Sequence, residues 1–85
     1  MTFEGALIKE QGINFAIVIV KQHILNSSHE SNRAILSFQP AFPGIPVVLM
    51  AQDYRGTPTY YGRRDIVNFL KSVPLQCVPW QKFTA

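Results

Sequence analysis

The sequence is poor in residues that cross-link small domains. Its 85 residues include one cysteine, Cys77. A single cysteine excludes a disulfide within the chain and a zinc site built from cysteines alone. The fold must therefore rely on its apolar core, and a chain this short buries only about 60 % of its unfolded surface.

Long apolar runs are missing as well. The longest run, from Phe15 to Val20, is far shorter than the roughly 20 residues that a membrane-spanning helix needs. The residues after Met1 lack the basic segment and apolar segment of a secretory signal. We therefore expect a soluble, cytoplasmic protein that does not enter a membrane.

Charged residues are few, at 15 % of the chain, whereas hydrophobic residues make up 47 %. This balance excludes a disordered chain. Eight lysines and arginines against five acids give a net charge of +3, which is weak support for a polyanionic partner. Repeats, low-complexity tracts and long linkers are absent, so we expect a single domain over residues 1–85.

The spacing of apolar residues predicts an α+β, or small α/β, two-layer domain. Strands are expected at residues 5–10, 13–25, 45–52, 57–61 and 75–84, and helices at residues 27–38 and 63–73. The order strand, strand, helix, strand, strand, helix, strand implies a mixed sheet of four or five strands with two helices. An extended connection is expected at residues 39–44.

Local signals set the ends of these elements. Ser27 and Glu30 have the spacing of a capping box at the start of the first helix. Pro74 ends the second helix, and Pro79 restricts the last strand to an edge of the sheet or interrupts it. We expect Cys77 to be a small buried hydrophobe and Trp80 to pack in the core.

The strands at 13–25 and 45–52 are apolar on both faces, as strands in the middle of a sheet are. Two helices on opposite faces would cover such a sheet. Two helices on one face would leave an apolar face for a second copy of the chain to cover. The sequence leaves both arrangements, and with them a homodimer, open.

The segment 54–65 holds all three tyrosines and three of the four arginines. Arg63 and Arg64 fall in the first turn of the second helix, where the helix dipole disfavours cations by about 0.3–1 kcal/mol each. Guanidinium groups beside free backbone N–H groups form an anion site, and tyrosines stack on bases or sugars. The predicted binding residues are Tyr54, Arg55, Tyr60, Tyr61, Arg63 and Arg64.

Two further interpretations concern this segment. Lys71, Lys82 and Trp80 would widen the basic and aromatic surface if the last strand lies nearby. In the alternative, the arginines are solvated or pair with acids, and the tyrosines pack in the sheet.

A Gly-Ile-Pro triplet at 44–46 precedes an apolar strand, Gly56 lies in the following turn, and Gly62 precedes the last helix. In these features the stretch 15–73 resembles the strand-helix-strand-strand-helix portion of the thioredoxin-like fold. The resemblance implies a cis peptide bond before Pro46 and a partner-binding edge beside it. A redox function does not follow, because the chain has no Cys-x-x-Cys motif.

Patterns typical of catalysis are also missing. His23, His29 and Cys77 have no neighbours at metal-ligand spacing, and no nucleophile motif or nucleic-acid module signature occurs. We expect a non-enzymatic protein that has no cofactor. Its expected partner is another protein or a small anionic ligand. The alternatives are a thioredoxin-like partner-binding domain without redox cysteines, a single-stranded nucleic-acid-binding module, and an enzyme whose site forms only between subunits.

Overall fold

The computed structural model describes residues 2–10 and 12–84. The strands and helices follow the predicted order. They are β1 (Thr2–Glu10), β2 (Ile13–Ile19), α1 (Ser28–Phe38), β3 (Val47–Gln52), β4 (Pro58–Tyr61), α2 (Arg64–Leu70) and β5 (Gln81–Thr84). Short 3-10 helices lie between them at η1 (Gln22–Asn26), η2 (Gln39–Ala41) and η3 (Leu75–Cys77).

The five strands form one mixed sheet in the order β4-β3-β2-β1-β5. β2 and β3 run parallel, and the remaining neighbours run antiparallel. Because a parallel pair needs a crossover connection, α1 joins β2 to β3. The two strands that are apolar on both faces therefore lie inside the sheet, and β5, which follows Pro79, lies at an edge. The predicted α+β class with a mixed sheet and two helices is confirmed.

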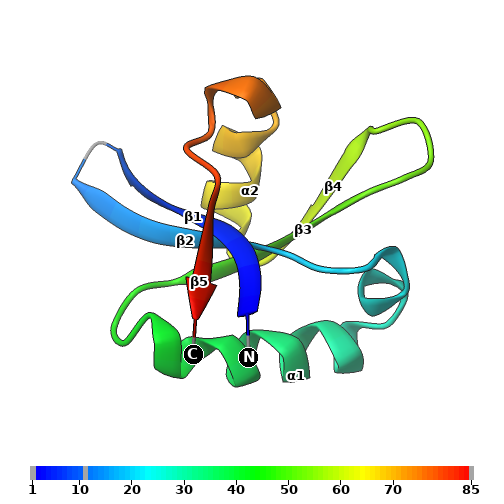
Figure 1. Cartoon of the computed structure of the whole chain (residues 1–85), viewed down its shortest axis with the longest axis horizontal. Helices are drawn as coiled ribbons and strands as arrows, with labels where there is room; N and C mark the ends of the chain where they lie inside the picture. The colour runs from blue at the N-terminus through cyan, green and yellow to red at the C-terminus, as the bar shows by residue number, and fades with distance from the viewer. Residues whose placement is uncertain (1, 11, 85) are drawn as a thin grey trace.

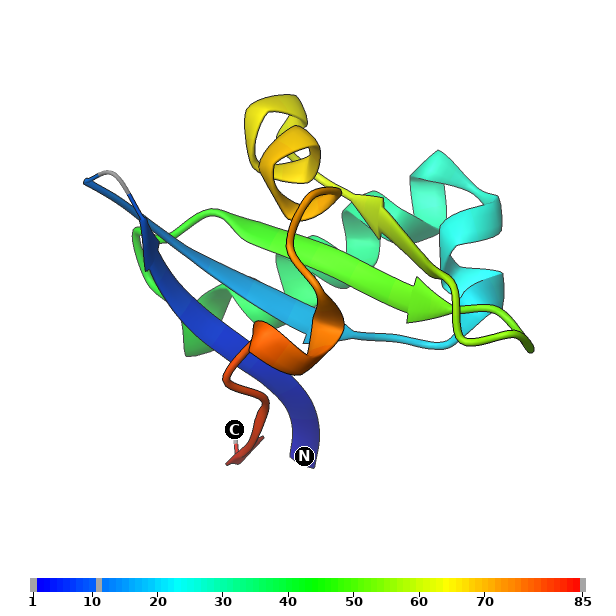
Figure 2. The same ribbon diagram turned by 90° about the horizontal axis from the view of Figure 1, so that it is seen from above.

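The two helices lie on opposite faces of the sheet (Figures 1 and 2). Phe15 and Ile17 of β2 belong to an apolar cluster with residues of α2. Ala16 and Val18 belong to a second cluster with residues of α1. Of the two arrangements that the sequence leaves open, this is the one in which both faces of the sheet are covered within one chain. An uncovered apolar face therefore no longer supports a homodimer.

The α1 face is built on aromatic contacts. Phe3 lies with its ring centroid 4.9 Å from that of Phe38 and 5.4 Å from that of Phe83. Phe42, which follows η2, packs at 5.1 Å from Phe83. Ser27 caps α1, since its hydroxyl accepts the N–H of Glu30 at 3.4 Å. The reciprocal bond from the Glu30 side chain is not among the hydrogen bonds of the described residues. Of the two hydrogen bonds of the predicted capping box, the structure therefore has the one that Ser27 accepts.

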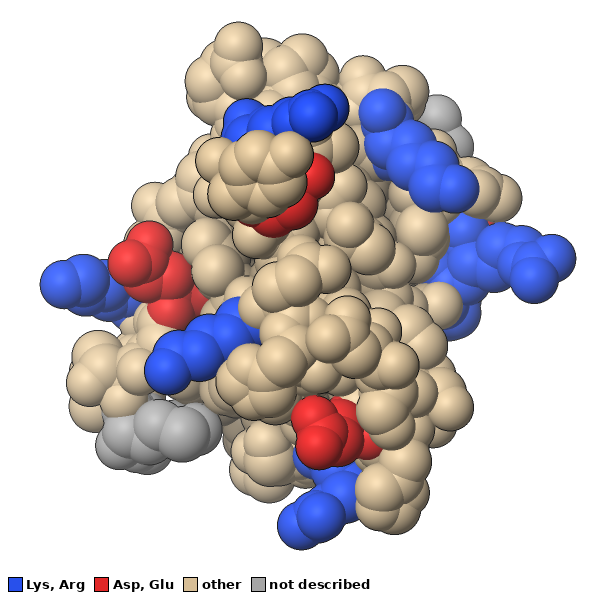
Figure 3. Space-filling view, turned by 90° about the vertical axis from the view of Figure 1, so that its right-hand side faces the viewer, with Lys and Arg blue, Asp and Glu red and all other residues tan. Residues whose placement is uncertain are grey.

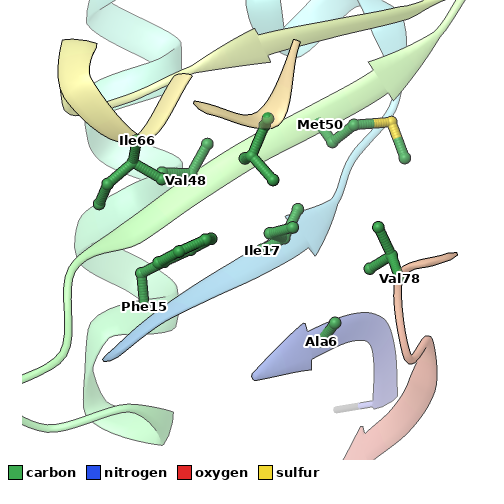
Figure 4. Packing of buried hydrophobic residues seen from close by; sticks show 8 residues of the cluster. Ala6, Phe15, Ile17, Val48, Met50, Ile66 and Val78 are labelled. Atoms are coloured by element: carbon green, nitrogen blue, oxygen red, sulfur yellow. The ribbon is translucent and has the colours of Figure 1, made fainter. Parts of the chain in front are cut away.

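The α2 face is a largely aliphatic core that also includes the ring of Phe15 (Figure 4). Ile66 and Leu70 of α2 are buried against Val48 and Met50 of β3 and against β2. Trp80 packs against this cluster from outside, and its indole N–H donates to the carbonyl oxygen of Leu75 at 3.0 Å. The expectation of a core position for Trp80 agrees with this packing.

Several predicted bounds are wrong. The strand expected at 13–25 ends at Ile19, since the polar residues from Lys21 onward turn into η1. Residues 39–41 form η2 instead of an extended connection. The second helix ends at Leu70, because the N–H groups of Ser72 and Val73 bond three residues back in a closing turn before Pro74.

The last expected strand is also shorter, because residues 75–77 form η3 and only Gln81–Thr84 pairs with β1. Cys77 is exposed, not buried as expected. Within this short turn Leu75 and Val78 pack against the α2 face, and Cys77 is left toward solvent.

The peptide bond before Pro46 is trans, as are the other peptide bonds of the described residues. The carbonyl oxygen of Pro46 accepts the N–H of Ala16 at 2.9 Å and so extends the parallel pairing of β2 with β3. The cis proline that the thioredoxin-like resemblance implies is therefore wrong. Within residues 2–10 and 12–84, no helix is long and apolar enough to cross a membrane.

Candidate functional site

The fold divides the predicted binding segment into a loop and a groove. Tyr54 and Arg55 lie in the β3–β4 loop, where one Asp53 carboxylate oxygen accepts the N–H groups of Arg55 at 2.8 Å and Thr57 at 3.0 Å. Gly56 completes this turn at φ +84°, a conformation that favours glycine. The loop is thus held by hydrogen bonds between the Asp53 side chain and its backbone.

The side chains at the tip of this loop contact each other. Tyr54 is 90 % exposed. The Arg55 guanidinium lies 5.4 Å from the Tyr54 ring centroid, and its Nε donates to the Tyr54 hydroxyl at 3.1 Å. Arg55 therefore stacks on its neighbour, and the structure does not bring this pair together with Arg63 or Arg64.

Tyr60 and Tyr61 are adjacent in β4 and so point to opposite faces of the sheet. Tyr61 packs on the α1 side, where its hydroxyl donates to Oδ1 of Asn32 at 3.1 Å. Tyr60 packs on the α2 side. Its hydroxyl is buried and has no hydrogen-bond partner among the described residues, and burial raises the pKa of this hydroxyl.

Arg63 is engaged by Asp65 in a two-point contact. Its Nε donates to Oδ1 at 2.9 Å and its Nη2 to Oδ2 at 2.7 Å. The hydrogen bonds from Arg63 hold the pKa of the Asp65 carboxyl below its usual value, and the same contact raises the pKa of Arg63. In the alternative interpretation of the sequence the arginines pair with acids. Arg63 is paired with Asp65 in this way.

Arg64 instead lines a hollow of about 440 Å³ between β4 and α2. Arg64, Asn68 and Lys71 lie at positions i, i+4 and i+7, which share one side of a helix. The remaining walls are Tyr60, Tyr61, Gly62 and Val67. Across residues 2–10 and 12–84 the one ion pair within 4 Å joins Arg63 to Asp65, so two cations line this hollow without a carboxylate partner.

A second hollow of about 470 Å³ adjoins the first and shares Tyr60, Val67 and Lys71 with it. Its other walls are Thr57, Pro58, Thr59, Leu70 and Val73. We call the two hollows together the β4–α2 groove. They lie on either side of the same three residues and form one surface.

Gly62 makes this arrangement possible at the junction of β4 with α2. A Cβ atom at this position would lie 2.9 Å from Cγ2 and 3.2 Å from Cα of Val48. A larger residue would push the start of α2 away from β3. The glycine therefore keeps Arg64 close to the β4 tyrosines.

Another hollow, of about 630 Å³, lies at another end of the sheet. It is lined in part by Glu4 and Lys82, which face each other across the β1–β5 pair. Gln52, a further wall residue, is engaged with the carbonyl oxygen of Gly56 at 3.0 Å. Among the described residues of this hollow, one cation stands opposite one acid, so their charges balance.

Lysine and arginine side chains do not gather into one large patch on the face seen in Figure 3, and acidic side chains lie between them. Lys82 lies in β5, at the opposite edge of the sheet from β4. Lys82 therefore does not widen the surface around Arg64, whereas Lys71 does.

Metal ligands do not cluster in the part of the chain that the structure describes, where no group of three or more His, Cys, Asp or Glu side chains could hold an ion. A comparison of the chain with protein-family models, with curated proteins and with solved structures finds no match in any of the three.

From the sequence, Lys71 is expected to widen the basic surface only if the last strand lies nearby, and Asn68 has no expected role in binding. The signal that connects them to Arg64 is present in the sequence, as the i, i+4, i+7 spacing. What the sequence does not show is that this side of α2 borders β4, because that contact depends on the order of the strands.

Proposed function

We propose that this chain is a non-enzymatic binding domain that takes a small anionic ligand in the β4–α2 groove. The observation that supports it is the pair of cations, Arg64 and Lys71, which line one hollow with Asn68 and have no carboxylate partner among residues 2–10 and 12–84. An anion between them would remove their mutual repulsion. Guanidinium binds phosphate and carboxylate at two points, and lysine adds a compact charge.

The proposal depends on side chains and not on the backbone of α2. This helix has seven residues, so its dipole is small, and Asp65 already occupies its first turn. Of the six residues predicted from the sequence, Arg64, Tyr60 and Tyr61 line the groove. Tyr54, Arg55 and Arg63 are left outside the proposed site, since each is engaged with a neighbour.

Single-stranded nucleic acid is the second candidate, because Tyr60 lies beside the two cations and base stacking on tyrosine is worth about 1–3 kcal/mol per base. It is less favoured, since the basic side chains in Figure 3 do not form a continuous track such as a polynucleotide backbone needs. The trans bond before Pro46 removes the support for a thioredoxin-like binding edge. A cytoplasmic location fits the exposed free thiol of Cys77, which a reducing compartment would preserve.

An amide-resolved NMR titration tests this proposal. Inorganic phosphate and a short mixed single-stranded oligonucleotide are added separately, each at low and at moderate salt. We expect phosphate to shift the amides of Gly62, Arg64, Asn68 and Lys71, and to do so less at moderate salt because ions screen exposed charges.

Matched variants locate the site. Replacing Arg64 and Lys71 together with alanine should weaken phosphate binding at least tenfold. Arg55→Ala also removes an exposed arginine, from the neighbouring loop, and should leave binding unchanged. Shifts confined to residues 53–57, or undiminished binding by the double variant, would show that the groove is not the site. Much tighter binding of the oligonucleotide than of phosphate would favour the second candidate.

A further inference from the structure

The two ends of the β4–α2 groove differ in chemistry. Arg64 and Asn68 line one end. Pro58, Leu70 and Val73 line the other, where Leu70 is fully buried and the other two are half-buried, and the exposed Thr57 and Thr59 complete its rim. Tyr60, Val67 and Lys71 are common to both ends. The groove thus passes from a cationic end to a more apolar one, with Lys71 at the junction.

An inorganic anion would fill only the cationic end. Binding is favoured when an apolar group of the ligand replaces water beside the apolar side chains that line a hollow. The Tyr60 ring lies between the ends, and aromatic rings pack favourably on other rings. The same groove can therefore hold an anionic group and an apolar group that are joined by a short link.

The charge at the cationic end indicates which kind of anion would bind there. Arg64 and Lys71 carry two positive charges, and Asn68 adds an uncharged donor and acceptor. A phosphate monoester carries about −1.5 to −2 at neutral pH, which matches two cations better than the single charge of a carboxylate. Its three free oxygens can also accept hydrogen bonds from all three side chains.

On this basis, and resting on the proposed function, we propose that the ligand is an organic phosphate monoester with a compact apolar group. Arg64 and Lys71 hold the phosphate. The apolar group lies against the Tyr60 ring, between Pro58 and Val73. The ligand class thus follows from the change in lining residues between the two ends of the groove.

A ligand series on the unaltered protein tests this inference, with affinities and amide shifts measured together by NMR. The probes are inorganic phosphate, glycerol phosphate, phenyl phosphate and phenol. Glycerol phosphate and phenyl phosphate share the charged group, and they differ in whether the attached group is polar or apolar.

We expect phenyl phosphate to bind about tenfold tighter than inorganic phosphate, and glycerol phosphate to gain nothing. Phenyl phosphate should shift Thr59 and Val73 in addition to Arg64, Asn68 and Lys71. Val73→Thr exchanges one methyl group of the side chain for a hydroxyl. It should reduce the preference for phenyl phosphate over glycerol phosphate.

The outcomes separate the inference from the proposed function. If phosphate binds at Arg64 but phenyl phosphate binds no tighter than glycerol phosphate, the amphipathic ligand is wrong and anion binding stands. If phenol binds as tightly as phenyl phosphate, the phosphate contributes nothing and the inference is again wrong. If none of the phosphates binds, both the inference and the proposed function are wrong.

Discussion

The face of the sheet covered by α1 and the face covered by α2 are closed by different means. α1 has eleven residues, begins with a Ser27 cap and packs on a cluster of phenylalanines. α2 has seven residues, and in the described structure no side-chain hydrogen bond caps its start. Beside α2 lie the two hollows of the groove.

This difference separates stability from binding within one small domain. The long, capped helix and the aromatic rings exclude water from one face. The short helix lies on the other face, and two hollows remain between it and the edge strand β4. We therefore expect substitutions on the α1 face to lower stability most, and substitutions around α2 to affect ligand binding more than folding.

The largest effect is expected for Phe42→Ala. Phe42 is 2 % exposed and contacts the rings of Phe3 and Phe83. Removing a buried ring costs about 3–5 kcal/mol, as lost burial and as a cavity. Denaturant unfolding measures this loss, which is a large part of the roughly 5–15 kcal/mol that stabilises a typical domain.

Val67→Ala is the matched change on the other face. Val67 is half-buried and lines the groove, so its truncation should lower the free energy of unfolding by about 1 kcal/mol. An equal cost for Val67→Ala and Phe42→Ala would contradict the division between a face that stabilises the domain and a face that binds.

Phe42 also illustrates which parts of the fold the sequence predicts and which it does not. The inside strands and both helices are predictable, because Phe15 and Ile17 alternate with Ala16 and Val18 and because Ser27 marks a helix start. Phe42 lies in a connection between two prolines, where no periodicity exists to show its direction. Its burial depends on the meeting of β1, β5 and η2, which the local sequence does not encode.

The same reasoning applies to the candidate site. The clustering of arginine and tyrosine in residues 54–65 correctly draws attention to β4 and to the start of α2. Which arginine faces the groove depends on Asp65, which engages Arg63 and leaves Arg64. The participation of Lys71 depends on the packing of α2 beside an edge strand, a contact between elements and not within one.

The next largest effect is expected at the start of α1. Ser27→Ala removes the hydroxyl that accepts the Glu30 N–H, and loss of an N-cap costs about 0.5–2 kcal/mol. The distance of 3.4 Å indicates a value near the lower end. Thermal unfolding measures the change.

Ser37→Ala is the control, since Ser37 is exposed in the same helix and its hydroxyl donates only to the local carbonyl of Ala34. It should change stability by less than about 0.5 kcal/mol. If the two serine variants behave alike, the cap is not what distinguishes α1 from α2.

A smaller effect, of opposite sign on the two faces, is expected for the β4 tyrosines. Tyr60→Phe removes a buried hydroxyl that has no partner in the described structure, so the free energy of unfolding should rise by about 1 kcal/mol. Tyr61→Phe removes the hydrogen bond to Asn32 and should lower it by about 0.5–1 kcal/mol. Two losses of stability would indicate that the Tyr60 hydroxyl is bonded in solution.

The pH dependence of Tyr60→Phe gives a further check. Burial raises the pKa of Tyr60 above its ordinary value of 10.0. Above that pH the unfolded chain releases the phenolic proton before the folded chain does, so stability falls as the pH rises. Tyr60→Phe should remove this part of the loss at alkaline pH, and Tyr61→Phe should not.

The smallest effect concerns the contrast between Arg63 and Arg64, which decides where the groove can hold an anion. NMR titration of the Asp65 carboxyl should give a midpoint below its usual pKa of 3.8, because Arg63 hydrogen-bonds the ionised form. Since the folded pKa is lowered, the pair stabilises the protein above the unfolded pKa, and this contribution is lost as the pH falls through the folded pKa.

Arg63→Ala should return the midpoint toward the usual value, and Arg64→Ala should leave it lowered. A midpoint that moves equally in both variants would mean that the two arginines share the carboxylate, and the groove would then have one free cation fewer than the anion site requires.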